Sequence, residues 1–129
     1  MNHTMNSKKN AVRVERIQQK RDAGIVSTHY PEVAGIVINM MYNQKGIKKS
    51  LQRTVNFFPS SCALFRIDCL CKDCVDGGFD MSQVITAMIG KRKEAAKGTL
   101  NCEGNGAGNG SSAEHATIVY EVAIQYAKN

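Results

Sequence analysis

The sequence predicts an α+β fold: an N-terminal helix, an antiparallel sheet of about five strands, and one amphipathic helix packed on that sheet. Several segments alternate apolar and polar residues, as half-buried strands do. The connections between the first three of these are short, which favours antiparallel pairing. A chain of 129 residues fits one domain. We divide it into a basic N-terminal helix or arm over residues 1–30 and a single α+β domain over residues 31–129.

The first expected element is a helix over residues 8–23, where helix-forming residues dominate. Gly24 follows it and suits the position after a helix end. The apolar stripe of this segment is thin, with Val14 and Ile17 as its main members. We therefore expect the helix to dock weakly on the rest of the chain.

Three strands are expected next, over residues 35–42, 50–58 and 62–70. In each of them apolar side chains occupy alternate positions, so that one face is suited to burial. Turn-forming residues at 43–46 and 59–61 separate the strands. This order predicts a three-stranded meander.

A helix is expected over residues 80–97, starting at Asp80 and ending before Gly98. Its apolar residues recur at helical spacing and form one face. These residues are Met81, Val84, Ile85, Met88 and Ile89.

Two more strands, over residues 99–103 and 116–126, are expected to close the fold, with a flexible glycine-rich loop over 103–114 between them. The segment 116–126 alternates apolar and polar residues throughout. At a sheet edge such a strand would pair with a second copy of the chain. A structural or interaction protein that forms a homo-oligomer, such as a homodimer, through a sheet edge is therefore one alternative function.

A tight cysteine cluster is the only constellation that predicts site chemistry. Cys69, Cys71 and Cys74 lie close in sequence, and Cys102 follows the expected helix. Cys71 and Cys74 have the two-residue spacing of a metal knuckle, and four thiolates in a tetrahedral array select zinc. We expect a structural zinc site, with buried or idle thiols as the alternative. Cys62 has the opposite strand parity and is expected to lie outside the site.

A thiol oxidoreductase is a further hypothesis for the same cysteines, and the sequence favours it less than a zinc site or idle thiols. Asp68, Asp73, Asp76 and Asp80 surround them, and negative neighbours disfavour a reactive thiolate. The sequence shows no nucleophile motif and no paired carboxylates that would indicate another enzyme. We therefore expect a non-enzymatic protein.

The formal charge of +6 is unevenly distributed along the chain. Residues 1–57 hold ten Lys or Arg and three acidic residues, whereas residues 58–129 hold seven and eight. A basic half of this kind favours contact with nucleic acid or an acidic protein, although a solvated surface would explain the same charges. The expected partner-binding residues are Lys8, Lys9, Arg13, Arg16, Lys20, Arg21, Lys45, Lys48 and Lys49.

Several features predict a cytoplasmic protein without a membrane partner. The chain contains no stretch of 18 apolar residues and begins without the apolar region of a secretory signal. Its five cysteines are odd in number and closely spaced, which favours a reducing compartment. The sequence thus predicts a small cytoplasmic binding module with a structural zinc site.

Overall fold

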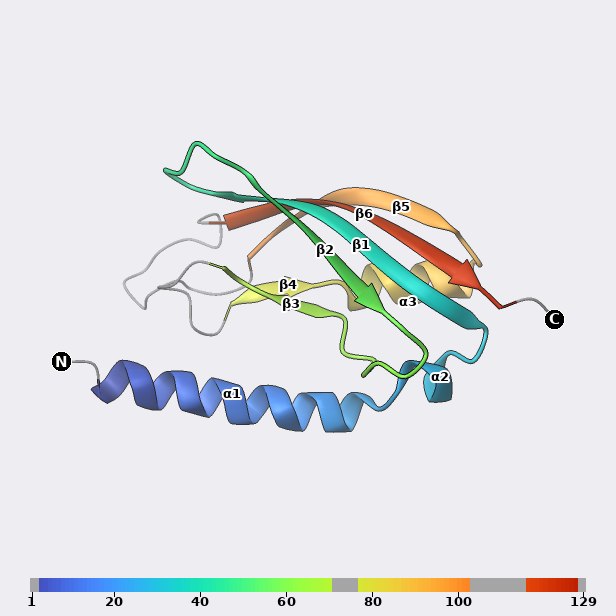
Figure 1. Ribbon diagram of the computed structural model, residues 1–129, viewed down its shortest axis with the longest axis horizontal. Coiled ribbons are helices and arrows are strands. Elements are labelled where there is room, and N and C mark those ends of the chain that lie inside the picture. The colour runs from blue at the N-terminus through green and yellow to red at the C-terminus, as the bar shows by residue number, and fades with distance from the viewer. Residues whose placement is uncertain (1–2, 71–76, 103–115, 128–129) are drawn as a thin grey trace.

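The computed structural model describes residues 3–70, 77–102 and 116–127. It confirms the α+β class, with a four-stranded antiparallel sheet, a two-stranded sheet and helices. Figure 1 shows the large sheet uppermost, the small sheet and one helix beneath it, and the long N-terminal helix along the opposite side. One face of the large sheet therefore covers the rest of the molecule, and the other face is open.

The large sheet has the strand order β2-β1-β6-β5, with every neighbouring pair antiparallel. Ile38 of β1 lies opposite Val55 of β2 and Val122 of β6, which fixes the register across the centre. The strands are β1 (Val33–Gln44), β2 (Leu51–Phe57), β5 (Ala95–Asn101) and β6 (Ala116–Tyr126).

The position of β6 corrects one expectation. The segment 116–126 was expected to be available as a sheet edge, but β6 is hydrogen-bonded to β1 on one side and β5 on the other. Its strong apolar alternation reflects this central place, because Ile118, Val122 and Ile124 all contribute to the core. The edge strands are β2 and β5.

The expected third strand of the meander, residues 62–70, is also wrong. Only β3 (Arg66–Asp68) is a strand, and it pairs with β4 (Gly78–Asp80) in a separate two-stranded sheet. After β2 the chain runs toward the N-terminal segment, where Cys62 forms an isolated bridge with Ile25. Burial of Phe65 beneath the large sheet then draws the chain away from the edge of β2.

The described part of the chain also forms three helices: α1 (His3–Ala23), α2 (Val26–His29) and α3 (Ser82–Gly90). The expected helix over 80–97 is too long. Arg92 adopts a left-handed φ of 52°, and the Lys93 amide donates to the Met88 carbonyl, which ends α3. Residues from Ala95 onward pair with β6 instead, because sheet pairing outweighs their helix propensity.

The hydrophobic core lies between the large sheet and the layer formed by β3, β4 and α3. Phe65 and Phe79 are its largest fully buried side chains, and Ile85 and Met88 project into it from α3. Helix α1 adds little to this core, since Val14 and Ile17 are 66% and 49% exposed. The two apolar residues expected to dock α1 therefore face solvent.

Candidate functional site

The structure places Cys69 directly after β3, at the start of the connection to β4. Its amide donates a hydrogen bond to the Gly77 carbonyl at 3.2 Å, which closes the base of that connection. The Sγ atom of Cys69 lies 3.6 Å from the Oη atom of Tyr42, near the end of β1. Cys69 is therefore held between the small sheet and the underside of the large one.

Cys102 follows β5 and is fully buried in the core. Its amide donates to the Ala116 carbonyl at 3.0 Å, and Ala116 lies opposite Gln44 of β1. Cys102 is therefore two residue positions and two strands away from Tyr42, a Cα separation of about 12 Å. Cys69 and Cys102 thus approach the same end of the sheet on its core side.

Cys71 and Cys74 lie outside the described residues. Within the parts of the chain that the structure describes, no three His, Cys, Asp or Glu side chains are grouped as metal ligands. Cys62 is exposed and lies on the connection between β2 and β3, which runs beside α2 (Figure 1). It is on the opposite side of β3 from Cys69 along the chain.

The predicted partner-binding cations fall on two separate elements. Lys8 and Lys9 are among those on α1, and their side chains are not part of the described structure. Arg16 faces the body of the molecule: its Nε atom donates to Asp68 Oδ1 at 3.1 Å, and its side chain is only 14% exposed. This ion pair links α1 to β3, so Arg16 serves to position the helix.

The remaining cations of α1 gather around exposed Ile17. Arg13, Lys20 and Arg21 lie three or four positions from Ile17 and so share its side of the helix. They make no ion pair with any described residue.

The acidic residues of α1 occupy a different side of the helix. Glu15 accepts a hydrogen bond from the Gln19 amide at 3.2 Å, and Asp22 accepts one from the Gln18 amide at 3.0 Å. Charges of opposite sign are therefore segregated around α1, which leaves one basic flank of Arg13, Lys20 and Arg21.

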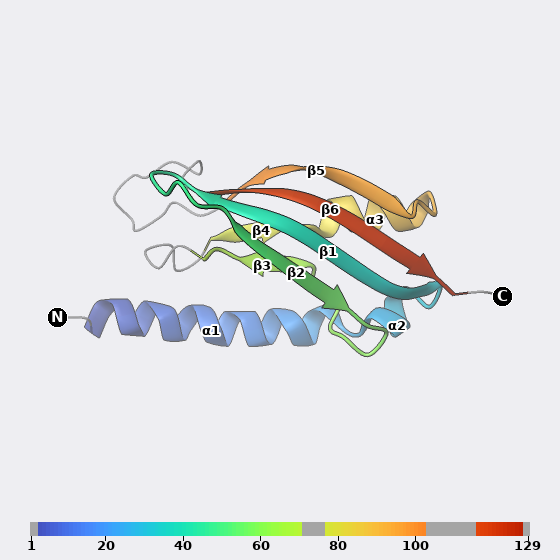
Figure 2. The ribbon, with the colours of Figure 1, turned by 45° about the horizontal axis from the view of Figure 1, so that its top comes forward.

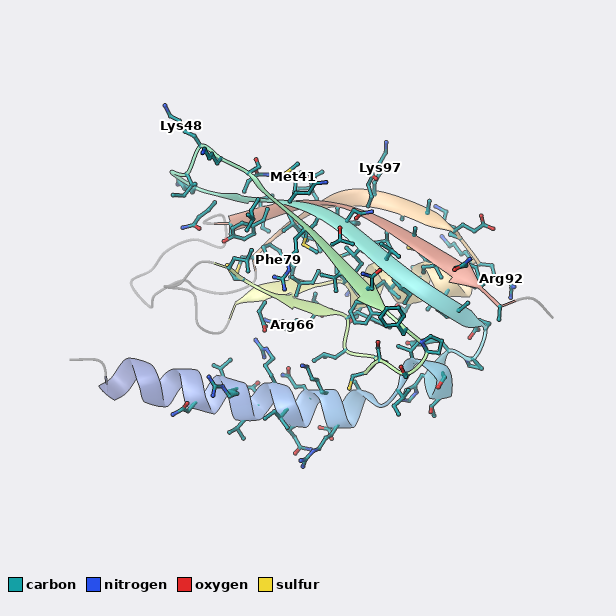
Figure 3. The ribbon with its side chains drawn as sticks, viewed as in Figure 1. Met41, Lys48, Arg66, Phe79, Arg92 and Lys97 are labelled. Carbon is teal, nitrogen blue, oxygen red and sulfur yellow. The ribbon has the colours of Figure 1, made fainter. Side chains whose placement is uncertain are left out.

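The second group of predicted cations occupies the turn between β1 and β2. Lys45, Lys48 and Lys49 are all exposed there, and Gly46 supplies the left-handed φ of 86° that the turn requires. Figure 3 shows Lys48 projecting from the tip of this turn, on the side of the molecule away from α1. The structure therefore does not bring the two cationic groups together.

Sequence reasoning missed the open face of the large sheet. Thr54 donates to Asn39 at 2.7 Å across this face, and Thr117 donates to Asn101 at 3.1 Å. The outward-facing Val119 is 50% exposed. The polar residues that alternate with apolar ones along the strands indicated a solvent-exposed side for each strand. The strand order was needed to place these residues on one face of the sheet.

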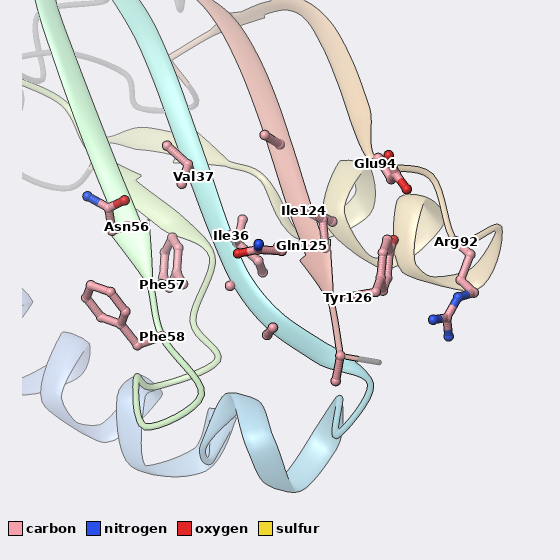
Figure 4. Close-up of a pocket in the computed structure, with 14 residues that line it drawn as sticks. Ile36, Val37, Asn56, Phe57, Phe58, Arg92, Glu94, Ile124, Gln125 and Tyr126 are labelled. Atoms are coloured by element: carbon pink, nitrogen blue, oxygen red, sulfur yellow. The ribbon is translucent and has the colours of Figure 1, made fainter. Parts of the chain in front are cut away.

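The open face is hollowed near the start of β1. A depression of about 1060 Å³ lies over the ends of β2, β1 and β6 and reaches the turn between α3 and β5. Figure 4 shows Asn56 and Val37 on one side of it and Arg92 on the other. The Arg92 guanidinium lies 4.9 Å from the centre of the Tyr126 ring, which places this cation at the rim.

None of the helices among residues 3–70, 77–102 and 116–127 is both long and apolar enough to cross a membrane. No family model, curated protein or solved structure matches the chain.

Proposed function

We propose that this protein is a non-enzymatic, cytoplasmic module that binds nucleic acid through its phosphate backbone. One observation carries the proposal: the exposed cations of α1 and of the β1–β2 turn make no ion pair with described residues, while the acids of α1 are bound by glutamines. Phosphate contacts from Lys and Arg supply most of the affinity of sequence-independent nucleic-acid binding.

The distribution of these cations favours nucleic acid over an acidic protein. They occupy two elements on different sides of the molecule, and the chain as a whole carries +6. A long polymer with regularly spaced charges meets more than one such group, whereas the acidic patch of a folded protein meets one.

The test is a titration of labelled duplex and single-stranded nucleic acid, each at 50 and 200 mM salt. If at least six phosphates are neutralised, affinity falls about a thousandfold between these concentrations. Polyglutamate serves as the competitor that represents an acidic protein surface. The absence of salt-sensitive binding, or equal displacement by polyglutamate at matched charge, contradicts the proposal.

Self-association through a sheet edge is the rival function. The two edges, β2 and β5, carry the exposed cations Arg53 and Lys97. Cations on edge strands oppose edge-to-edge pairing. Native mass spectrometry separates the two functions, because a dimer that binds no nucleic acid supports the rival.

We also propose a structural zinc held by Cys69, Cys71, Cys74 and Cys102. Cys69 lies at the base of the connection that carries Cys71 and Cys74, and Cys102 approaches the same end of the large sheet. The Tyr42 hydroxyl is placed to donate to the Cys69 sulfur, as partners of metal-bound thiolates do. Zinc would tie the β3–β4 connection to the end of β5.

Metal analysis of protein purified without added zinc tests this site. We expect one zinc per chain in the wild type, loss of zinc in Cys74→Ser, and retention in the matched control Cys62→Ser. A folded, metal-free wild type contradicts the site. In that case the rate of alkylation against pH distinguishes idle thiols from a thiol oxidoreductase, which requires a depressed thiol pKa.

A further inference from the structure

The open face of the large sheet has the composition of a surface that contacts a polar polymer. No described element covers it, since β3, β4 and all three helices lie on the other side of the sheet (Figures 1 and 2). Its outward-facing strand residues are mostly Asn, Gln, Thr and small apolar residues, and Met41 and Val119 lie opposite each other on β1 and β6. They include no aromatic ring, so the strands offer no platform for stacking unpaired bases.

Cations lie at both ends of the large sheet and over the middle of its open face. Figure 3 shows Lys48 at one end, Lys97 over the centre and Arg92 at the other end. The β1–β2 turn contains three cations and no acidic residue, and the α3–β5 turn contains three cations and one acidic residue, Glu94. These end clusters are Lys45, Lys48 and Lys49 in the β1–β2 turn, and Lys91, Arg92 and Lys93 in the α3–β5 turn.

Among the described residues, the acidic residues on this side are fewer than the cations. Glu121 of β6 lies opposite Lys97 of β5 in the register, and Glu94 is the last residue of the α3–β5 turn. None of the seven cations makes an ion pair with a described residue. The face therefore has a positive surplus that is concentrated at its two ends.

The strand register gives the separation of the two turns. Ala95 of β5 lies opposite Ala123 of β6, which lies opposite Val37 of β1. Lys93 precedes Ala95 by two residues, so it is about ten residue steps from Lys45 along the strand direction, or about 33 Å. One helical turn of duplex spans about 34 Å. Two phosphate clusters one turn apart on a duplex would therefore meet the two cationic turns.

We infer that the open sheet face binds double-stranded nucleic acid without regard to sequence, with one cationic turn on each of two successive helical turns of the duplex. The inference rests on the proposed function and names its substrate class and surface. Lys97 would contact the backbone between the two turns. The uncharged amide and hydroxyl side chains of the strands would face the sugar and phosphate groups of the duplex that lies over the sheet.

The test combines charge reversal with duplex length. One variant reverses the first turn (Lys48→Glu with Lys49→Glu), another reverses the second (Lys91→Glu with Lys93→Glu), and a matched control reverses two cations of α1 (Arg13→Glu with Lys20→Glu). Each is titrated with a duplex of about 20 base pairs, as DNA and as RNA, and with a hairpin of about six base pairs, which is too short to reach both turns. Circular dichroism confirms that each variant is folded.

With the long duplex we expect either turn variant to lose at least about tenfold in affinity and to reduce the salt slope by about 2, while the α1 variant loses less than either. With the hairpin we expect weak binding and a smaller effect of each turn variant, because the other turn can still bind it. The DNA and RNA arms show which duplex is preferred.

Unchanged long-duplex affinity in a turn variant, or a greater loss in the α1 variant, overturns this inference and leaves nucleic-acid binding intact. Stronger binding of a single strand than of a duplex also overturns it. If the wild type binds none of these polymers, the proposed function itself is wrong.

Discussion

Gly98 shows at the scale of a single residue why β5 has its sequence. A Cβ atom at this position would lie 2.5 Å from Tyr120 Oη and 2.9 Å from its ring carbon Cζ, closer than side chains approach. Tyr120 is buried and lies opposite Gly98 in the register, so its ring occupies the space that the glycine leaves. The glycine therefore belongs to the packing of the sheet and does not end a helix.

Substitution of this glycine tests the packing. Gly98→Ala is expected to lower the free energy of unfolding by about 1–3 kcal/mol, because Tyr120 must move in a filled core. Gly90→Ala is the matched control: nothing lies within 4 Å of an added Cβ there, and alanine in α3 is expected to be neutral or to stabilise by up to about 1 kcal/mol. Urea denaturation measures both, and equal stabilities for the two variants would contradict the account of β5.

Tyr126 links β6 to the end of α3 and gives the fold a pH dependence. Its hydroxyl donates to the Lys93 carbonyl at 2.7 Å and the Met88 carbonyl at 3.2 Å. Burial raises the pKa of Tyr126 above its ordinary value of 10.0, although Arg92 partly offsets the effect. Above pH 10 the unfolded chain therefore releases a proton that the folded protein retains, so stability falls as the pH rises.

Tyr126→Phe isolates this contribution. We expect it to destabilise the fold by about 1 kcal/mol at pH 8, because the two carbonyls lose their donor. The difference between wild type and variant should narrow above pH 10, where only the wild type has this hydroxyl to ionise. Denaturation at pH 8, 9, 10 and 11 checks it, and a difference that stays constant across this range would show that Tyr126 does not titrate with folding.

At the scale of elements, α1 is joined to the rest of the molecule by a polar link. Arg16 bonds Asp68 of β3, while Val14 and Ile17 face solvent. Asp68 is 69% exposed, so the pair contributes only about 0.2–1 kcal/mol to global stability. Its main effect is on the position of α1.

Arg16→Ala is therefore expected to increase amide hydrogen exchange along α1 and to leave exchange in β1 and β6 unchanged. Arg13→Ala is the control, since Arg13 is exposed and makes no ion pair with a described residue. If both variants exchange like the wild type, α1 is held by other contacts.

The elements also show what the sequence could predict and why it could not predict the rest. Apolar alternation correctly indicated β1, β2 and β6, and helix-forming residues indicated α1. The helix over 80–97 was overextended because Ala95, Ala96 and Lys97 favour helices locally, whereas pairing with β6 decides their conformation. The small sheet was missed because β3 and β4 have three residues each, too few to show a period.

The candidate sites were also predictable from the sequence only in part. The cysteine spacing and the lysines of the β1–β2 turn could be found in the sequence. The residues Lys91–Lys93 were visible there too, but only as the end of a long helix. Their placement at the far end of the open face depends on the strand order and register, which contacts between distant segments determine.

At the scale of the whole molecule, the chain presents two basic surfaces on opposite sides of one core. One is the flank of α1 around Ile17, and the other is the open sheet face between its two cationic turns (Figure 3). The central claim is that the open face is the one that binds duplex.

The most direct measurement records the side-chain amide NMR signals of Asn and Gln during titration with a duplex of about 20 base pairs. Asn39, Asn56 and Gln125 lie on the open face, whereas Gln18 and Gln19 lie on α1. We expect the first three signals to shift with added duplex and the two from α1 to shift less. Shifts confined to Gln18 and Gln19 would contradict this claim.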